Sequence, residues 1–406
     1  MNPSPIVSTM MSVPLSLNHV LERAGLLFAN QTVVSRLPDK RYVQHTYQEI
    51  HHRTRRLAHA LQKLGLQKGD RVATLCWNHH VHLECYFGIP AAGGVMHTLN
   101  LRLSPDEIAW IANDAKDRIL IVDDVLLPLL NSFRHQCSFE HIIVVPFTGQ
   151  PHLGPEPDYE AWIGAASSDD FQYASHDEND PVSMCYTSGT TGKPKGVVYS
   201  HRSTLLHTLV GCMGDYWALR STDVVLPVTP MFHANSWGIP YGALMVGAKL
   251  VFPGPHLHPE DLLDLMHQTP PTLALGVPTI WMGLIQTYEA SQHSQPSRWK
   301  LPVGMRSLVG GAAVPESLIR AFEKHGIWIM QGWGMTETSP LCTVSYKTFE
   351  AANASPDETF RRAALAGMPV PLVDLRLRGD DGKDAPWNGE QVGEIQVRGQ
   401  IGRAHV

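Results

Sequence analysis

The stretch VSMCYTSGTTGKPKG, residues 182–196, places a loop of small hydroxyls, glycines and lysines directly after a short apolar segment. Four Thr or Ser, three Gly and two Lys fall within Tyr186–Gly196. The apolar segment is typical of a buried strand, and a strand that ends in glycine-rich backbone presents several N–H and O–H donors to one point. Such a concavity binds an anion, most often a phosphate. The stretch therefore predicts a phosphate-binding loop at the end of a buried strand.

This loop is not a Walker-type P-loop, which requires G-x-x-x-x-G-K followed by Ser or Thr. Only two residues separate Gly189 from Gly192, and Pro194 follows Lys193 where the magnesium-binding hydroxyl would stand. The alternative is a flexible surface turn without a binding function. Turns seldom carry so many hydroxyls and two lysines just after a hydrophobic strand, so we favour the phosphate loop.

Helical and strand patterns alternate on both sides of the loop, which predicts an α/β protein. Residues 46–65 predict a helix with a Thr46/Glu49 capping box, and residues 104–114 predict another that begins at Ser104. Apolar strands follow these helices, as in RVATLC, RILIVDD and HIIVVP. Downstream of the loop, DVVLPVTP, AKLVFP, TLALGVP, MRSLVGG and WIMQGWG predict further strands, with helices between them.

The 406 residues suggest more than one unit, because a domain averages about 150 residues. We predict a first α/β subdomain over 1–175, a second over 176–370 and a small β-barrel-like subdomain over 371–400. Residues 151–180, rich in Pro, Ser, Asp and Glu, are interpreted as the linker between the first two. Short strands around Asp-Asp-Gly turns predict the third.

Composition narrows the classes of function. A net charge of −6 argues against a nucleic-acid partner, which would need clustered basic residues. Six dispersed Cys without a C-x-x-C pair predict buried thiols in a reducing compartment. With no signal-peptide pattern and no apolar run of about 18 residues, we expect a cytoplasmic protein without a membrane span. The histidine pairs at 51–52 and 79–80 lack matching ligands, so surface or core histidines are the simpler interpretation.

Five motifs in order resemble the adenylate-forming (AMP-binding) superfamily, which contains acyl-CoA synthetases, peptide-synthetase adenylation domains and beetle luciferases. They are YTSGTTGKPKGVVYSH from Tyr186, PMFHANSWG at Pro230–Gly238, GGAAVP at Gly310–Pro315, QGWGMTETSP at Gln331–Pro340 and GEIQVRG at Gly393–Gly399. The resemblance implies the large N-terminal domain of that family, with two α/β subdomains and mainly parallel sheets. It also implies a two-step reaction with ATP, Mg²⁺ and coenzyme A. A carboxylate attacks the α-phosphorus of ATP, and a thiolate then displaces AMP from the acyl adenylate.

The resemblance assigns residues to the nucleotide. The phosphates of ATP would be held by Thr187, Ser188, Gly189, Thr190, Thr191 and Lys193, and Lys195 closes the signature. Thr336 would donate to the α-phosphate, and Glu337 would be the magnesium ligand, since a hard oxygen donor suits that ion. Gly311 and Ala312 would form one adenine wall, and Gln331, Gly332 and Trp333 the other. Taken alone, Glu337 could be a surface carboxylate and the Gly-Gly pair a simple turn.

The resemblance also assigns the acid. His233 would stand near the α-phosphate and the acyl carboxylate, while Trp237, Tyr241, Val277, Gly310 and Gly334 would border the acyl tunnel. Peptide-synthetase domains carry Asp at the position of His233, so an amino-acid substrate is disfavoured. Apolar residues nearby favour an aliphatic acid, and the sequence is most similar to the branch of medium- to long-chain fatty acid and methylthiopropionate CoA ligases. Taken alone, His233 or Trp237 would more often be a packed core residue, and only the motif favours the functional interpretation.

Family members continue past GEIQVRG to a Thr-Gly-Asp motif and a small C-terminal domain, and neither is present in this sequence. We interpret Ile401–Val406 as a non-native tail and expect acyl-CoA synthesis to be lost or nearly lost. Two alternatives stay open: transfer of the acyl group to a carrier protein, and a non-catalytic nucleotide- or acyl-binding protein. A homodimer is plausible by family analogy only.

Overall fold

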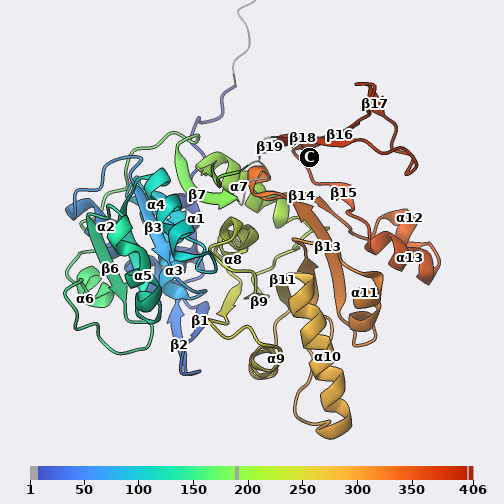
Figure 1. Cartoon of the computed structure of the whole chain (residues 1–406), viewed down its shortest axis with the longest axis horizontal. Coiled ribbons are helices and arrows are strands. Elements are labelled where there is room, and N and C mark those ends of the chain that lie inside the picture. Colours follow the sequence, from blue (N-terminus) through green and yellow to red (C-terminus); the bar gives the residue numbers. More distant parts are fainter. Residues whose placement is uncertain (1–7, 188–191, 400–401, 406) are drawn as a thin grey trace, which may run out of the picture.

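The computed structural model of the chain describes residues 8–187 and 192–399, and the backbone alone of 402–405 (Figure 1). Its architecture is α/β, as the alternating pattern predicted. Three sheets account for the strands of these residues, and two of the sheets are mainly parallel.

The first sheet has six strands, of which only the last, β8, runs antiparallel to its neighbour. The strands lie in the order β6 (His141–Val145), β5 (Asp117–Asp123), β3 (Arg71–Leu75), β4 (Val95–Thr98), β7 (Pro181–Thr187) and β8 (Lys195–Ser200). The buried strand predicted before the phosphate loop is β7, which is confirmed. The loop therefore leaves this sheet at its β7–β8 hairpin.

The second sheet has nine strands, parallel from β13 through β1 and antiparallel at both edges. The order is β15 (Met368–Pro369), β14 (Leu341–Val344), β13 (Trp328–Gly334), β12 (Arg306–Val309), β11 (Leu273–Gly276), β9 (Val224–Pro227), β10 (Lys249–Phe252), β1 (Thr32–Arg36) and β2 (Tyr42–Thr46). The hairpin β1–β2 comes from the first 50 residues, whereas β7 and β8 of the first sheet lie beyond residue 175. Each half of the chain thus lends a hairpin to the sheet of the other, and the division at 175 stays a prediction.

The third sheet is small and entirely antiparallel, and it lies apart from the other two at the upper right of Figure 1. Its order is β17 (Asp384–Ala385), β16 (Val373–Arg378), β18 (Glu394–Gly399) and β19 (Gly402–His405). Short antiparallel strands were predicted from the turn chemistry of this segment.

Among the described residues, eight of the thirteen α-helices begin at a residue whose side chain caps the first turn. Thr46 forms the predicted capping box with Glu49, and Ser104, the predicted start of the other helix, forms a second capping box with Glu107. The helices are α1 (Leu17–Leu27), α2 (Tyr47–Lys63), α3 (His80–Ala91), α4 (Pro105–Ala115), α5 (Leu127–Phe133), α6 (Tyr159–Gly164), α7 (His201–Gly211), α8 (Ile239–Val246), α9 (Pro259–Gln268), α10 (Pro278–Ser294), α11 (Glu316–Glu323), α12 (Phe349–Ala352) and α13 (Pro356–Ala363).

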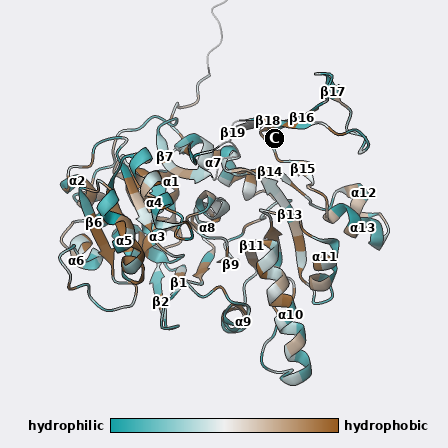
Figure 2. Cartoon of the chain, in the orientation of Figure 1, coloured by the Kyte–Doolittle hydropathy of each residue, from teal (hydrophilic) through white to brown (hydrophobic). Residues whose placement is uncertain are grey.

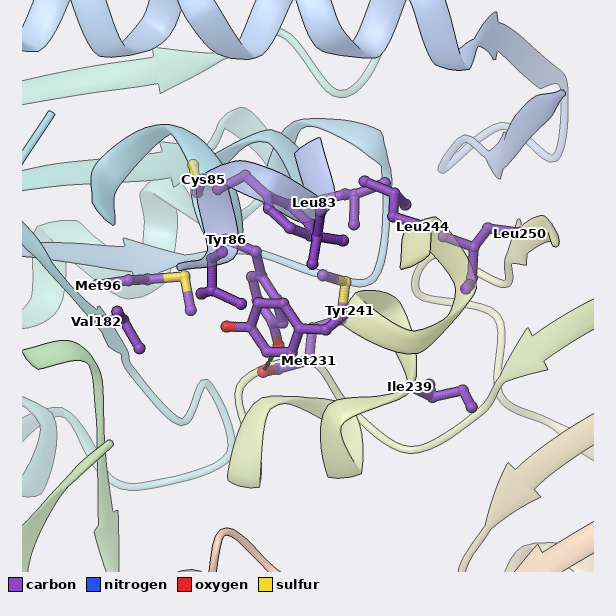
Figure 3. Close-up of a cluster of buried hydrophobic side chains, with 14 of the residues drawn as sticks. Leu83, Cys85, Tyr86, Met96, Val182, Met231, Ile239, Tyr241, Leu244 and Leu250 are labelled. Carbon is purple, nitrogen blue, oxygen red and sulfur yellow. Dashed lines mark hydrogen bonds between the residues drawn. The ribbon is translucent and has the colours of Figure 1, made fainter. Parts of the chain in front are cut away.

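The main hydrophobic core lies between the two large sheets and is built around α3 and α8. Every residue of α3 is buried, including the polar His80, His82 and Glu84. Figure 3 shows Tyr86 of α3 beside Tyr241 of α8, with the Tyr86 hydroxyl donating to the carbonyl of Met231. Figure 2 shows that strands of the six-stranded sheet are largely brown, and therefore hydrophobic, whereas β2 at the edge of the nine-stranded sheet is hydrophilic. This core fixes the two sheets relative to each other.

The segment 151–180 differs from the predicted linker. It contains α6, and its Tyr159 and Phe171 are almost fully buried. Tyr159 donates a hydrogen bond to Glu84 of α3, so the segment packs back onto the first half. Because most residues of the segment are polar, the prediction of a linker overlooked the two aromatic residues that anchor it to the core. Within the described ranges, no helix is both long enough and apolar enough to cross a membrane.

Candidate functional site

A cleft of about 500 Å³, measured to its open mouth, lies where β12 and β13 end. Segments far apart in the sequence line it: the turn after His233, the glycines after β12, and the run from Gly332 to Leu341. The lining residues are Trp217, His233, Ala234, Trp237, Leu308, Gly310, Gly311, Gly332, Trp333, Gly334, Met335, Thr336, Pro340 and Leu341. Three of the five sequence motifs therefore meet in one cavity, at the carboxyl edge of a parallel sheet where ligands usually bind.

Bare backbone forms one wall of the cleft. A Cβ at Gly310 would lie 2.6 Å from the carbonyl oxygen of Gly332, so any side chain there would force the two strand ends apart. Gly311 has φ +82°, a conformation that favours glycine, and a Cβ on it would approach Val277 at 3.4 Å. The missing side chains leave a flat surface that suits a planar ring.

A second part of the lining comes from a left-handed turn, η3 (Ala234–Gly238). Its non-glycine residues have φ between 42° and 55°, and Gly238 follows with φ 78°. Left-handed helical backbone costs about 1–2 kcal/mol per L-residue, so four such residues in succession mark a strained segment. Strain of this kind persists only where surrounding contacts hold it.

Side chains of the six-stranded sheet and the backbone after β9 hold the strained turn. The Asn235 amide donates to Ser183 of β7 at 2.6 Å, and the Ser236 hydroxyl donates to the carbonyl of Thr229 at 2.8 Å. Thr98, at the end of β4, donates to the carbonyl of Phe232 at 3.1 Å. The result is a fixed orientation for the two side chains that the turn presents, His233 and Trp237.

The His233 side chain is exposed at the cleft wall. Surrounding protein nevertheless lowers the pKa of its ring below the ordinary histidine value through desolvation, and the positive charge of Arg102 adds to this. The ring is therefore neutral at neutral pH and offers both a donor and an acceptor to a ligand. Trp237, almost fully buried, stands beside the glycine wall, and its ring would lie 3.7 Å from a Cβ at Gly310.

The phosphate loop adjoins the cleft through its flanking strands. Ser188, Gly189, Thr190 and Thr191 lie outside the described residues. Thr187 and Lys195 pair across the β7–β8 hairpin, and Tyr199 of β8 donates to the Thr336 carbonyl at 2.7 Å. Lys193 and Lys195 are exposed, with the Lys193 ammonium 5.1 Å from the ring centre of Trp110. Neither Thr187 nor the two lysines line the cavity itself.

Glu337 lies in the short helix η4 (Thr336–Thr338), next to the hairpin. Its carboxylate is half-buried and forms no ion pair within the part of the chain that the structure describes. Burial raises the pKa of Tyr199 well above its ordinary value, and the nearby negative charge of Glu337 contributes. An uncommitted carboxylate beside the loop is suited to a hard divalent cation, so the residues present fit magnesium.

Other predicted residues lie outside the cleft. Gln331 is buried, and its side chain accepts the Val314 N–H at 2.7 Å, so it fixes the glycine loop from behind. Ala312 is exposed, and Val277 backs Gly311. Tyr241 packs in the core against Tyr86 rather than in the cleft (Figure 3).

Sequence reasoning missed some of the lining residues. Trp217, in the loop between α7 and β9, and Leu308 of β12 form part of the cleft without belonging to any motif. No sequence signal marks Trp217, because its place depends on the packing of α7 and α8 around it.

A second polar cluster lies at the carboxyl edge of the six-stranded sheet. Ligand atoms of Cys76, His79 and Asp123 lie within 4.8 Å of one another, and all three residues are buried. The His79 ring donates to Asp123 at 2.8 Å, Asp123 also accepts the Trp77 N–H, and the other His79 ring nitrogen accepts from Val81. These bonds satisfy the cluster internally, which agrees with the prediction of core histidines in this segment.

The sequence model of the AMP-binding enzyme family matches residues 21–402. A long-chain-fatty-acid–CoA ligase of Thermus thermophilus is 42% identical over 401 residues, which are 97% of this chain and 70% of the relative. A 3-methylmercaptopropionyl-CoA ligase of Ruegeria lacuscaerulensis is 39% identical, over 97% of this chain and 73% of the relative.

Solved structures agree on the fold. A long-chain-fatty-acid-CoA ligase from Archaeoglobus fulgidus superposes with a TM-score of 0.82 at 20% identity, over all of this chain and 79% of the other. An anthranilate CoA ligase in complex with anthranoyl-AMP gives a TM-score of 0.80 at 24% identity, over 97% of this chain and 71% of the other. At these identities the likeness concerns the fold alone.

Proposed function

The chain belongs to the AMP-binding enzyme family, and from this premise we propose that it activates an aliphatic carboxylic acid with ATP. The acid would become an acyl adenylate and then, with coenzyme A, an acyl-CoA. Relatives named as acid–CoA ligases at 36–42% identity support this reaction class.

The observation that carries the proposal is the convergence in the cleft. The His233 turn, the Gly310–Gly311 wall and the run through Thr336 line one cavity, and the hairpin of the phosphate loop adjoins it through Tyr199. This is the arrangement that the reaction needs, because a nucleotide and a carboxylate must meet in one place.

Two anions approach each other in the first step, so preorganised donors and cations must offset the charge. We assign the adenine to the glycine wall and to Trp333, the α-phosphate to Thr336, and the outer phosphates to the loop with Lys193 and Lys195. A magnesium ion held by Glu337 would neutralise the phosphates. The neutral ring of His233 would orient the acid by a hydrogen bond without pairing its charge.

The acid itself would extend from His233 along Trp237 and Leu341. These walls are apolar, so binding would remove alkyl surface from water at about 0.8 kcal/mol per methylene. The relatives act, by their names, on long-chain fatty acids and on 3-methylmercaptopropionate. Both classes are aliphatic acids without an amino group, which agrees with a histidine at position 233.

Equilibrium binding by calorimetry tests the proposal on the chain as it stands. ATP with magnesium, and a non-hydrolysable acyl adenylate mimic (an acyl sulfamoyladenosine), should both bind. Glu337→Gln should weaken magnesium-ATP at least about tenfold, or 1.4 kcal/mol, and leave the metal-free mimic unchanged. Failure of the wild-type chain to bind either ligand would reject the function.

A further inference from the structure

We propose that Trp217 is the floor of the acyl end of the cleft and restricts the acid to a short chain, best one that carries a hydrogen-bond acceptor near its far end. The inference rests on the proposed function and names the substrate class of the same site. The acids meant are of the size of pentanoate, and the acceptor is an ether, thioether or hydroxyl group.

The indole of Trp217 fills the space into which a longer chain would extend. It is completely buried and lines the cleft together with Leu308 and Leu341. Leu308 is itself a core residue of β12, exposed by only 2%. The cavity therefore ends on packed side chains rather than on an open channel.

Three glycines make room for this ring. A Cβ at Gly211 of α7 would lie 2.3 Å from Cζ3 of the indole, and one at Gly242 of α8 would lie 3.2 Å from the same atom. A Cβ at Gly238 would lie 3.5 Å from Cη2. The bulk of Trp217 is thus accommodated by missing side chains on two helices and on the strained turn that carries Trp237.

The loop that carries Trp217 is fixed to the sheet beneath it. Arg306 of β12 donates to the carbonyls of Trp217 and Ala218, each at 2.8 Å, and pairs with Asp223 at 2.7 Å. The backbone N–H of Trp217 donates to the Gly211 carbonyl at 2.9 Å. These bonds fix the backbone of the loop, and the close packing of the indole against Gly211, Gly238 and Gly242 confines the ring itself.

The preference for an acceptor comes from the indole N–H. Nε1 of Trp217 is buried and has no hydrogen-bond partner among the described residues. A Cβ at Gly211 would meet the Cε3–Cζ3 edge of the ring, so the side that packs against α7 is the edge opposite Nε1. Buried donors are normally satisfied, so an acceptor atom on the acid would supply the missing bond. Sulfur is a weaker acceptor than oxygen but fits an apolar cavity.

Calorimetry with three probes tests the inference: pentanoyl, decanoyl and methylthiopropanoyl sulfamoyladenosine. The pentanoyl and methylthiopropanoyl chains have the same number of heavy atoms, with sulfur in place of one methylene. The wild-type chain should bind the pentanoyl probe at least about tenfold more tightly than the decanoyl probe. It should bind the methylthiopropanoyl probe about threefold more tightly than the pentanoyl probe.

Two substitutions separate the two parts of the inference. Trp217→Ala should raise the affinity for the decanoyl probe at least about tenfold, because the floor is removed. Trp217→Phe keeps most of the bulk but lacks the N–H, so it should retain the chain-length limit and abolish the methylthiopropanoyl preference. Trp281→Phe is the matched control, since Trp281 is equally buried and also has an unpartnered N–H among the described residues but lies outside the cleft.

The outcomes are distinct. Equal binding of the pentanoyl and decanoyl probes by the wild-type chain overturns the inference while leaving the proposed function intact, and this comparison needs no variant to fold. A methylthiopropanoyl preference that survives Trp217→Phe overturns the role of the N–H. Absence of binding by every probe and by magnesium-ATP rejects the proposed function itself.

Discussion

Both large sheets are mainly parallel, so in each of them several strands end at one carboxyl edge. The residues at these two edges nevertheless differ in their chemistry. In the six-stranded sheet, the edge is filled by Cys76, His79 and Asp123, which are fully buried and bonded to one another or to nearby backbone. In the nine-stranded sheet, the corresponding edge carries Gly310 and Gly332, whose bare backbone leaves a cleft. One edge is closed by satisfied polar groups, and the other is kept open.

Backbone strain follows the same division. The four successive left-handed residues of η3 face the open edge, where they present Trp237 and His233. At the closed edge, His79 has ordinary extended backbone and caps α3 through its ring. A run of successive strained residues therefore lies beside the open edge, whereas the packed cluster at the closed edge has unstrained backbone at His79. Each of the following substitutions breaks or sharpens this contrast.

The largest change in the free energy of unfolding is expected at the closed edge, where ligand affinity should not change. Asp123→Ala leaves the buried His79 ring without its acceptor and should lower the free energy of unfolding by about 3 kcal/mol. Affinity for the pentanoyl probe should stay within about twofold, because neither residue touches the cleft. Urea unfolding and calorimetry measure the two quantities. Glu323→Ala, an exposed site in α11, is the control, and a lost affinity in Asp123→Ala would show that the two edges are coupled.

At the open edge we expect a substitution to affect ligand binding more than stability. In Gly310→Ala the new Cβ meets the Gly332 carbonyl at 2.6 Å, so the wall of the cleft must shift. Probe affinity should fall at least about thirtyfold, or 2 kcal/mol, with a stability loss of about 1–2 kcal/mol. Gly164→Ala in α6 is matched, since a Cβ there meets nothing within 4 Å. Normal probe binding by the Gly310→Ala variant would remove the glycine wall from the binding site.

A smaller effect is expected at the strained turn. Asn235→Ala removes the bond to Ser183 and places a residue with a costly left-handed conformation at φ 51°, so about 2 kcal/mol of stability should be lost. Asn235→Gly removes the same bond but relieves the strain. The difference between the two variants, by urea unfolding, isolates the strain at about 1 kcal/mol. If both variants lose probe affinity alike, the bond to Ser183 is what orients the turn.

The sequence predicted most of the helices and strands because their signals are local. The Thr46 box that starts α2, the buried strand β7 and the glycines at 310 and 332 are written in short motifs, and all are in the predicted elements. The placement of side chains was less accessible. Helix α8 is apolar on every side, so nothing in the sequence indicates that Tyr241 faces the core rather than the cleft.

Trp217 is the converse case, because it lines the cleft although nothing in the sequence predicted it. Its position at the cleft depends on Gly211 and Gly242, which lie in different helices, and on Arg306 in β12. Such a dependence on tertiary contacts leaves no periodic trace in the sequence. Residues that bind through backbone or through motif geometry can be predicted, whereas residues placed by packing need the structure.

Two buried histidines, one near each sheet, allow the contributions of the two regions to acid sensitivity of folding to be compared. His207, which accepts the Leu341 N–H behind the cleft, and His82, which bonds Thr74 in the first sheet, both have their pKa lowered by burial to about 3. In the unfolded chain a histidine titrates near a pKa of about 6.5, so below that value the unfolded state binds more protons than the folded state. The free energy of unfolding should therefore fall as the pH drops from about 6.5 towards 3, by about 1.4 kcal/mol per pH unit for each histidine.

Substitution separates their contributions. His207→Gln retains an acceptor for the Leu341 N–H but does not titrate, so the slope of stability against pH in this window should decrease by about one proton. His82→Gln should decrease it by the same amount, and the double variant by the sum, because the two rings bond to different sheets. Urea unfolding at several pH values between the folded and unfolded pKa gives these slopes. An unchanged slope in His207→Gln would mean that the His207 ring binds its proton equally well in the folded and unfolded states. The ring behind the cleft would then be in contact with water in solution, and the cleft would not be closed on that side.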